Sequence, residues 1–169
     1  MSRITYNEDG EMWAMIRWAG AAKQAINGKR GQSVLREIEA ALLAMPHKRL
    51  AYHDLCSPTG DVCIIGALAQ ARGFGRLDLE IAQDRYDMGR RADVRWRNGK
   101  FNPDAVLPEP EPGVDSTWDW AEKHLGITHT LAWELVEKND EAYGGRAVTP
   151  EERYEGVLAW VRKHLKVTA

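Results

Sequence analysis

The feature that most constrains the fold of this chain is the helical spacing of its apolar residues. In Glu11–Ile26, apolar residues recur every three to four positions and form one stripe on a helix, which ends at the Asn27-Gly28 pair. A second stripe of the same period runs over Ser33–Met45 and is stopped by Pro46. Residues 29–32 form a short basic connector, and we expect the two helices to pair antiparallel across it.

Five further segments carry the same helical pattern. They are Val62–Arg72, Leu77–Met88, Trp118–Leu125, a helix capped by Thr128, and a last helix that opens with a capping box at Thr149-Pro150-Glu151-Glu152. The segment 50–63 lacks this period. Its turn residues are compatible with one short β-hairpin. The sequence therefore predicts a mainly α protein, a compact multi-helix domain of about six to seven helices.

Length and composition bear on the number of domains and on the compartment. With 169 residues, 44% of them hydrophobic and 28% charged, the chain is expected to form one globular domain over 1–169. No apolar run is long enough to span a membrane, and the N-terminal residues lack the apolar region of a secretion signal. The two cysteines do not suggest a disulfide framework. We therefore expect a cytoplasmic protein with no membrane partner.

One long segment, about 89–115, interrupts the helical pattern. Its second half carries four prolines within ten residues, which predicts an extended insertion. The chain around its first half is basic and aromatic, with Arg85, Arg90, Arg91, Arg95, Trp96, Arg97 and Lys100. Arginine with tryptophan is typical of protein interfaces and of single-stranded nucleic-acid sites, although many charged loops are merely solvated. We expect this segment to contact a protein partner, with a nucleic acid as the alternative.

Seven tryptophans are a high count for a chain of this length. Five of them lie at the edges of the apolar stripes rather than at their centres: Trp13, Trp18, Trp120, Trp133 and Trp160. Rings at a stripe edge are partly buried in many proteins, but a partner or a second subunit also covers such rings. These five residues are therefore candidate contacts for a protein partner or for a homodimer.

The sequence predicts no catalytic residue, no cofactor and no metal site. It contains no P-loop, no dinucleotide-binding glycine pattern, no nucleophile elbow and no zinc-protease helix. His47, His53, Cys56 and Cys63 lie close enough in sequence to raise zinc binding or a Cys–His nucleophile. However, Cys63 falls in an apolar run and is better interpreted as a small buried thiol. We favour a non-enzyme, and a small hydrolase or transferase that uses Cys63 or an acidic cluster is a further alternative.

The segment Trp118–Leu131 has the rhythm of a DNA-binding helix–turn–helix. Its second helix would present His129, Thr130, Glu134, Glu137 and Lys138 outward. This set is net acidic, whereas contact with phosphates requires positive charge. A plain helical hairpin is therefore the better interpretation.

Several short motifs resemble a single protein family. They are the run Gly28–Glu37 followed by Ala44-Met45-Pro46, the motif Gly60-Asp61-Val62-Cys63 before Gly66-Ala67, the triplet Asn139-Asp140-Glu141, and Thr149–Arg153 before Trp160-Val161. Together they resemble uncharacterised small proteins of bacteriophages and proteobacterial prophages, over most of the chain except about 76–115. The resemblance implies a phage accessory protein in the host cytoplasm and gives no residue a role. We expect such a protein to bind a host or phage macromolecule, for example as a defence-system inhibitor of the anti-CRISPR type.

Overall fold

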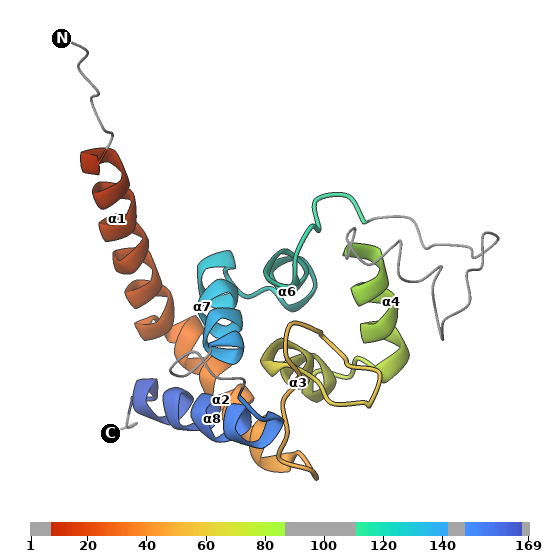
Figure 1. The fold of residues 1–169 in the computed structure, drawn as a ribbon. Helices are drawn as coiled ribbons and strands as arrows, with labels where there is room; N and C mark the ends of the chain where they lie inside the picture. The colour runs from red at the N-terminus through yellow and green to blue at the C-terminus, as the bar shows by residue number, and fades with distance from the viewer. Residues whose placement is uncertain (1–7, 87–110, 142–147, 167–169) are drawn as a thin grey trace.

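Seven helices make up the described part of the chain. The computed structural model describes residues 8–86, 111–141 and 148–166, without the side chains of 8–15 and 84–86. Along the chain, Figure 1 shows α1 (Glu8–Asn27), α2 (Lys29–Ala44), α3 (Ile64–Ala71), α4 (Arg76–Tyr86), α6 (Thr117–Leu125), α7 (His129–Asp140) and α8 (Pro150–His164). The same ranges contain no β-strand, so the predicted mainly α, multi-helix fold is confirmed. None of these helices is long and apolar enough to cross a lipid bilayer.

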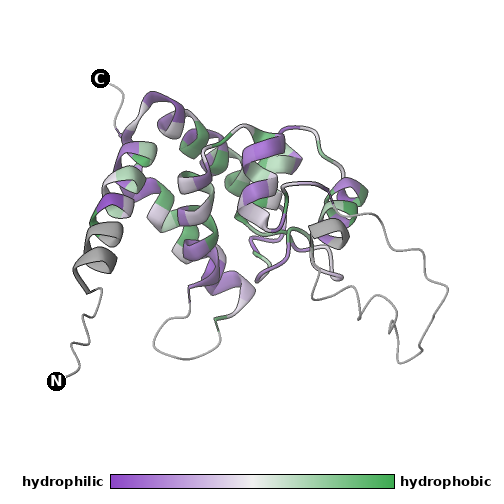
Figure 2. Cartoon of the chain, turned by 90° about the horizontal axis from the view of Figure 1, so that it is seen from above, coloured by the Kyte–Doolittle hydropathy of each residue, from purple (hydrophilic) through white to green (hydrophobic). Residues whose placement is uncertain are grey.

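Two helices, α2 and α7, form the centre of this arrangement. α2 packs against α1, α3 and α8, and α7 packs against α1, α3, α6 and α8. Fully buried leucine and isoleucine side chains fill these contacts, among them Leu35, Ile38, Leu42, Ile64, Ile65, Leu68, Leu131 and Leu135. Figure 2 shows the apolar residues gathered where the helices meet, which is how amphipathic helices remove their apolar faces from water.

The corner between α1 and α2 differs from the prediction. Lys29–Gln32, expected to be a connector, is the first turn of α2, and Gly28 alone separates the two helices. The turn fits because Gly31 has no side chain: a Cβ atom there would lie 1.9 Å from the Ala25 carbonyl oxygen. With so short a connection, α2 leads away from α1 rather than back along it (Figure 1), so the predicted antiparallel pairing is wrong.

The segment 50–63 forms two isolated β-bridges rather than a hairpin with strands. Val62 pairs with Leu50 in the parallel sense and with Cys56 in the antiparallel sense. The segment also bonds to helices that are distant in sequence. The Leu50 N–H donates to the Pro150 carbonyl at 3.0 Å, and the Leu55 N–H donates to the Gln83 side chain at 2.7 Å. Backbone groups that find no partners in a sheet ladder are thus paired with the surrounding helices.

One buried amide joins this segment to α7 and α3. Asn139 of α7 is 1% exposed. Its side-chain oxygen accepts the Ile64 N–H at 3.1 Å, and its side-chain nitrogen donates to the Ala51 carbonyl at 2.9 Å. The amide therefore satisfies two backbone groups that the core would otherwise leave unpaired.

Candidate protein-contact surface

Three tryptophans from three helices meet on one side of the helical domain. Trp133 of α7 lies between the other two: its ring centroid is 5.7 Å from that of Trp18 on α1 and 4.6 Å from that of Trp118 on α6. The imidazole ring of His129, at the start of α7, meets the rings of Trp18 and Trp118 edge-on, with centroid separations of 6.4 and 6.5 Å. We call Trp18, Trp118, His129 and Trp133 the tryptophan surface.

The turn between α6 and α7 positions three of these four rings. Ser116 caps α6 and Thr128 caps α7, each by accepting a backbone N–H from three residues further along. α6 ends at Gly126, whose φ of 62° favours glycine. Across the turn, His129 Nε2 lies 3.4 Å from Asp119 Oδ1, which adds a polar contact between the two helices. The α6–α7 hairpin thus supplies three of the four rings, and α1 supplies the fourth.

α1 supplies Trp18 from the face by which it attaches to the domain. Trp18, Ala22 and Ile26 recur every four residues along this helix, and the last two are almost fully buried in the core. Trp18 is half-buried. Its ring contacts Trp133 and His129, so it fastens α1 to α7 and also remains partly open to solvent.

The geometry of the tryptophan surface suits contact with another protein. All four of its side chains are half-buried, so part of each ring is accessible. The ring contacts hold these side chains in place, so less side-chain freedom is lost when a second molecule packs on them. Tryptophan is also strongly enriched among the residues that contribute most to the affinity of protein complexes.

Acidic residues border the tryptophan surface. Glu122 follows Trp118 by one turn on α6, and Glu137 follows Trp133 by one turn on α7. Both glutamates are exposed. Acidic groups at the border repel phosphates.

The other predicted contact residues do not join this surface. Trp120 is 3% exposed and packs edge-on against Phe74, with ring centroids 5.4 Å apart, so it is a core residue rather than a contact residue. Trp160 lies on α8, half-buried beside His164. The remaining predicted contacts lie outside the described side chains: Trp13, Arg85, Arg90, Arg91, Arg95, Trp96, Arg97 and Lys100. Trp118 was not among the predicted contacts, and its ring contacts with Trp133 and His129 place it in the surface.

The two thiols are buried and are not prepared for nucleophilic chemistry. Cys63 caps α3 by accepting the Gly66 N–H at 3.4 Å, and burial raises the pKa of its thiol to about 12. Burial also raises the pKa of the Cys56 thiol. A catalytic thiol needs the opposite shift, because the thiolate is the nucleophile. The interpretation of Cys63 as a buried thiol is confirmed, and the described residues contain no group of three or more His, Cys, Asp or Glu that could hold a metal ion.

One histidine–carboxylate pair has a structural explanation. His53 places its ring Nδ1 3.1 Å from Asp140 Oδ2, and its backbone N–H donates to Oδ1 of the same carboxylate at 3.1 Å. The backbone of His53 has a φ of 61°, which is uncommon for a residue other than glycine. Asp140 therefore supports an unusual turn through one hydrogen bond to the backbone and one contact with the imidazole ring.

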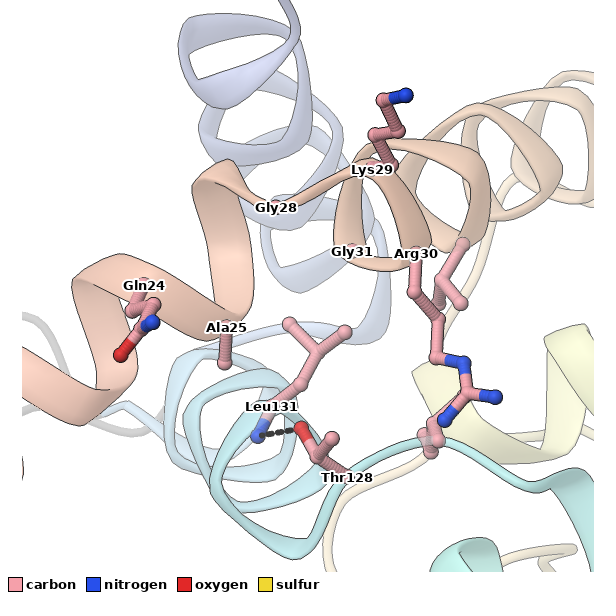
Figure 3. A pocket seen from close by; sticks show the side chains of 10 residues that line it. Gln24, Ala25, Gly28, Lys29, Arg30, Gly31, Thr128 and Leu131 are labelled. Carbon is pink, nitrogen blue, oxygen red and sulfur yellow. Dashed lines mark hydrogen bonds between the residues drawn. The ribbon is translucent and has the colours of Figure 1, made fainter.

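A small recess lies where α1, α2 and the start of α7 meet (Figure 3). Its volume is about 210 Å³, and its lining includes the first turn of α2 together with Ile127, Thr128 and Leu131. Lys29 and Arg30 extend away from each other at this turn. The lining contains no carboxylate, thiol or imidazole, and its charged side chains are those of Lys29 and Arg30.

The α6–α7 pair also tests the helix–turn–helix interpretation against geometry. The two helices and their short turn are present, as the sequence predicted. His129, the first residue that a recognition helix would present, instead contacts two tryptophans and Asp119. Together with the acidic residues of α7, this contact favours a plain helical hairpin.

Comparison of the chain with protein-family models, with curated proteins and with solved structures found no match.

Proposed function

We propose that this chain is a phage-type accessory protein that acts without catalysis, by binding a protein of the host or of the phage through the tryptophan surface. One observation carries the proposal: three tryptophans from three helices lie in ring contact, and each is only half-buried. A single half-buried tryptophan is ordinary. Three in ring contact, each partly accessible, offer a partner protein several tryptophan contacts at one place.

The best test compares two tryptophans of similar burial on different faces. Trp133→Ala removes the central ring of the tryptophan surface, and Trp160→Ala removes a half-buried ring from α8. The tagged full-length chain and both variants are incubated with a proteobacterial host lysate, with and without nuclease, and captured proteins are quantified by mass spectrometry. Circular dichroism and thermal unfolding establish that both variants are folded.

We expect a captured protein that the wild-type chain and Trp160→Ala retain and that Trp133→Ala loses. Nuclease treatment should not reduce the amount of this captured protein. Capture that is equal for Trp133→Ala and for the wild-type chain would refute the role of the surface. Capture that disappears after nuclease treatment would indicate that the partner is a nucleic acid rather than a protein.

A cellular assay addresses the identity of the partner. If the partner belongs to a host defence system, expression of the chain should restore plaque formation by a phage that the system restricts. Trp133→Ala should fail to restore it, and Trp160→Ala should succeed. If Trp133→Ala restores plaque formation at a matched protein level, any anti-defence effect does not depend on the tryptophan surface.

A further inference from the structure

α1 has a second face, which points away from the domain. Ile16 is 52% exposed, and Ala19 and Gly20 are exposed beside it. Ile16 precedes Trp18 by two residues and Gly20 precedes Ala22 by two, which places them on nearly opposite sides of the helix from the attachment face. A Cβ atom at Gly20 would meet nothing within 4 Å. Another helix can therefore approach this face closely.

Positions seven residues apart follow this outer face along α1. Asp9, Ile16 and Lys23 are spaced by seven, as are the pairs Met12 with Ala19 and Trp13 with Gly20. The helical register of α1 places all seven positions on one side of the helix. Positions with this spacing stay on the same side of a helix over several turns, so all of them can face one partner helix. Figure 1 shows that the N-terminal part of α1 projects beyond the other helices, so a partner helix could lie along it.

We propose that two copies of this chain associate through the outer face of α1, with the two helices antiparallel and Ile16 at the two-fold axis. In this register Met12 lies opposite Gly20 of the second copy, and Trp13 lies opposite Ala19. The register thus sets each position with a large residue opposite a position with a small one, a pattern that allows two helices to approach closely. The same pairs occur twice, as the symmetry of a two-fold dimer requires.

The charges along α1 favour a second copy of the chain as the partner, and they favour the antiparallel orientation of the two helices. The first half of α1 is acidic, with Glu8, Asp9 and Glu11, and the second half is basic, with Arg17 and Lys23. The antiparallel register places Asp9 of each copy opposite Lys23 of the other, whereas a parallel register would align like charges. The face is therefore complementary to itself in one orientation only.

This dimer is separate from the proposed partner contact. The tryptophan surface uses Trp18 on the attachment side of α1, and the dimer uses Ile16 and its neighbours on the opposite side. A pair of helices of this length, about 30 Å, forms an interface at the small end of specific interfaces. We expect reversible association in the micromolar range, and each dimer would present two tryptophan surfaces.

Sedimentation equilibrium of the full-length chain over a range of concentrations tests the proposal. Ile16→Glu places two negative charges at the axis and should leave the chain monomeric. Lys23→Glu converts both ion pairs to repulsion and should weaken association about tenfold. Asp9→Lys combined with Lys23→Glu restores opposite charges and should recover most of the association. Arg36→Glu makes the same charge change at an exposed position of α2 and should have no effect.

Each result bears on a different part of the proposal. A wild-type chain that stays monomeric at millimolar concentration would overturn it, as would a dimer that Ile16→Glu leaves intact. Failure of the double charge exchange to recover association, with Lys23→Glu still weakening it, would overturn the antiparallel register. Circular dichroism at low concentration establishes that each variant is folded as a monomer.

Discussion

Replacing Gly66 with alanine should destabilise the protein, although alanine is the better helix former. At an open helical position this change stabilises a protein by about 1 kcal/mol. In α3, however, the added Cβ atom would lie 2.2 Å from the Leu55 carbonyl oxygen and 2.9 Å from the Val62 Cβ. Ordinary contact begins near 3.4 Å. Both neighbours are rigid, so α3 or the 50–63 segment would have to move by about 1 Å.

The movement would also disturb the start of α3. The Leu55 carbonyl accepts the N–H of Cys63, the residue that caps this helix, at 3.4 Å. Overpacking a well-filled core costs about 1–3 kcal/mol, and a rigid backbone neighbour places Gly66 at the upper end. The gain in helix propensity offsets about 1 kcal/mol of this cost. We therefore expect the free energy of unfolding to fall by about 2 kcal/mol.

Urea denaturation followed by circular dichroism measures this change. Gly20→Ala is the matched control, because it makes the same substitution in a helix where the new Cβ atom meets nothing. At a protein concentration where the chain is monomeric, we expect Gly20→Ala to raise the free energy of unfolding by up to about 1 kcal/mol. A Gly66→Ala variant as stable as the wild-type chain would refute the reasoning, since the close approach at α3 would then carry no cost.

Two further predictions concern buried polar groups. Asn139→Ala should lower the free energy of unfolding by about 2–4 kcal/mol, because it leaves the Ile64 N–H and the Ala51 carbonyl unpaired in the core; a denaturation midpoint equal to that of the wild-type chain would contradict this. For Cys63, the thiol pKa is about 12 in the folded chain against about 9 when exposed, so the unfolded state alone loses the proton at intermediate pH. The contribution of Cys63 to the free energy of unfolding is therefore complete below pH 9 and declines as pH rises towards 12. Cys63→Ala should remove this part of the pH dependence. Rapid alkylation of Cys63 in the folded chain at pH 8 would show that the thiol is not shielded.

The helix boundaries that the sequence predicted well are those set by local chemistry. The capping box of α8 is present: Thr149 accepts the Glu152 N–H at 3.2 Å, and the Glu152 side chain accepts the Thr149 N–H at 3.0 Å. The stop at Gly126 is likewise present, with a left-handed backbone. Both signals depend on residues within one turn of each other, so a local pattern is sufficient to reveal them.

The boundaries that the sequence did not predict depend on contacts between distant residues. α2 begins at Lys29 rather than at Ser33 because its first turn is held from outside. Gln32, in that turn, donates to the carbonyls of Ile26 and His164, and its side-chain oxygen accepts the Lys166 N–H. Two of these partners lie more than 130 residues away. A pattern of nearby residues contains no information about them.

The difference between local patterns and contacts of distant residues also explains why the sequence predicted Trp18 and Trp133 of the tryptophan surface but not Trp118. In α6, Trp118 and Trp120 are two residues apart, so a helix of nine residues turns them to nearly opposite sides and can bury only one of them fully. The buried face of α6 also carries Ala121 and Leu125, and this register takes Trp120 into the core. The sequence pattern indicated Trp120 of this pair as the contact residue, and the structure buries it instead. Which ring of the pair is buried depends on the side from which α7 packs, and a local pattern does not contain that information. Once α7 packs there and α1 adds Trp18, Trp118 becomes the ring that another protein can reach.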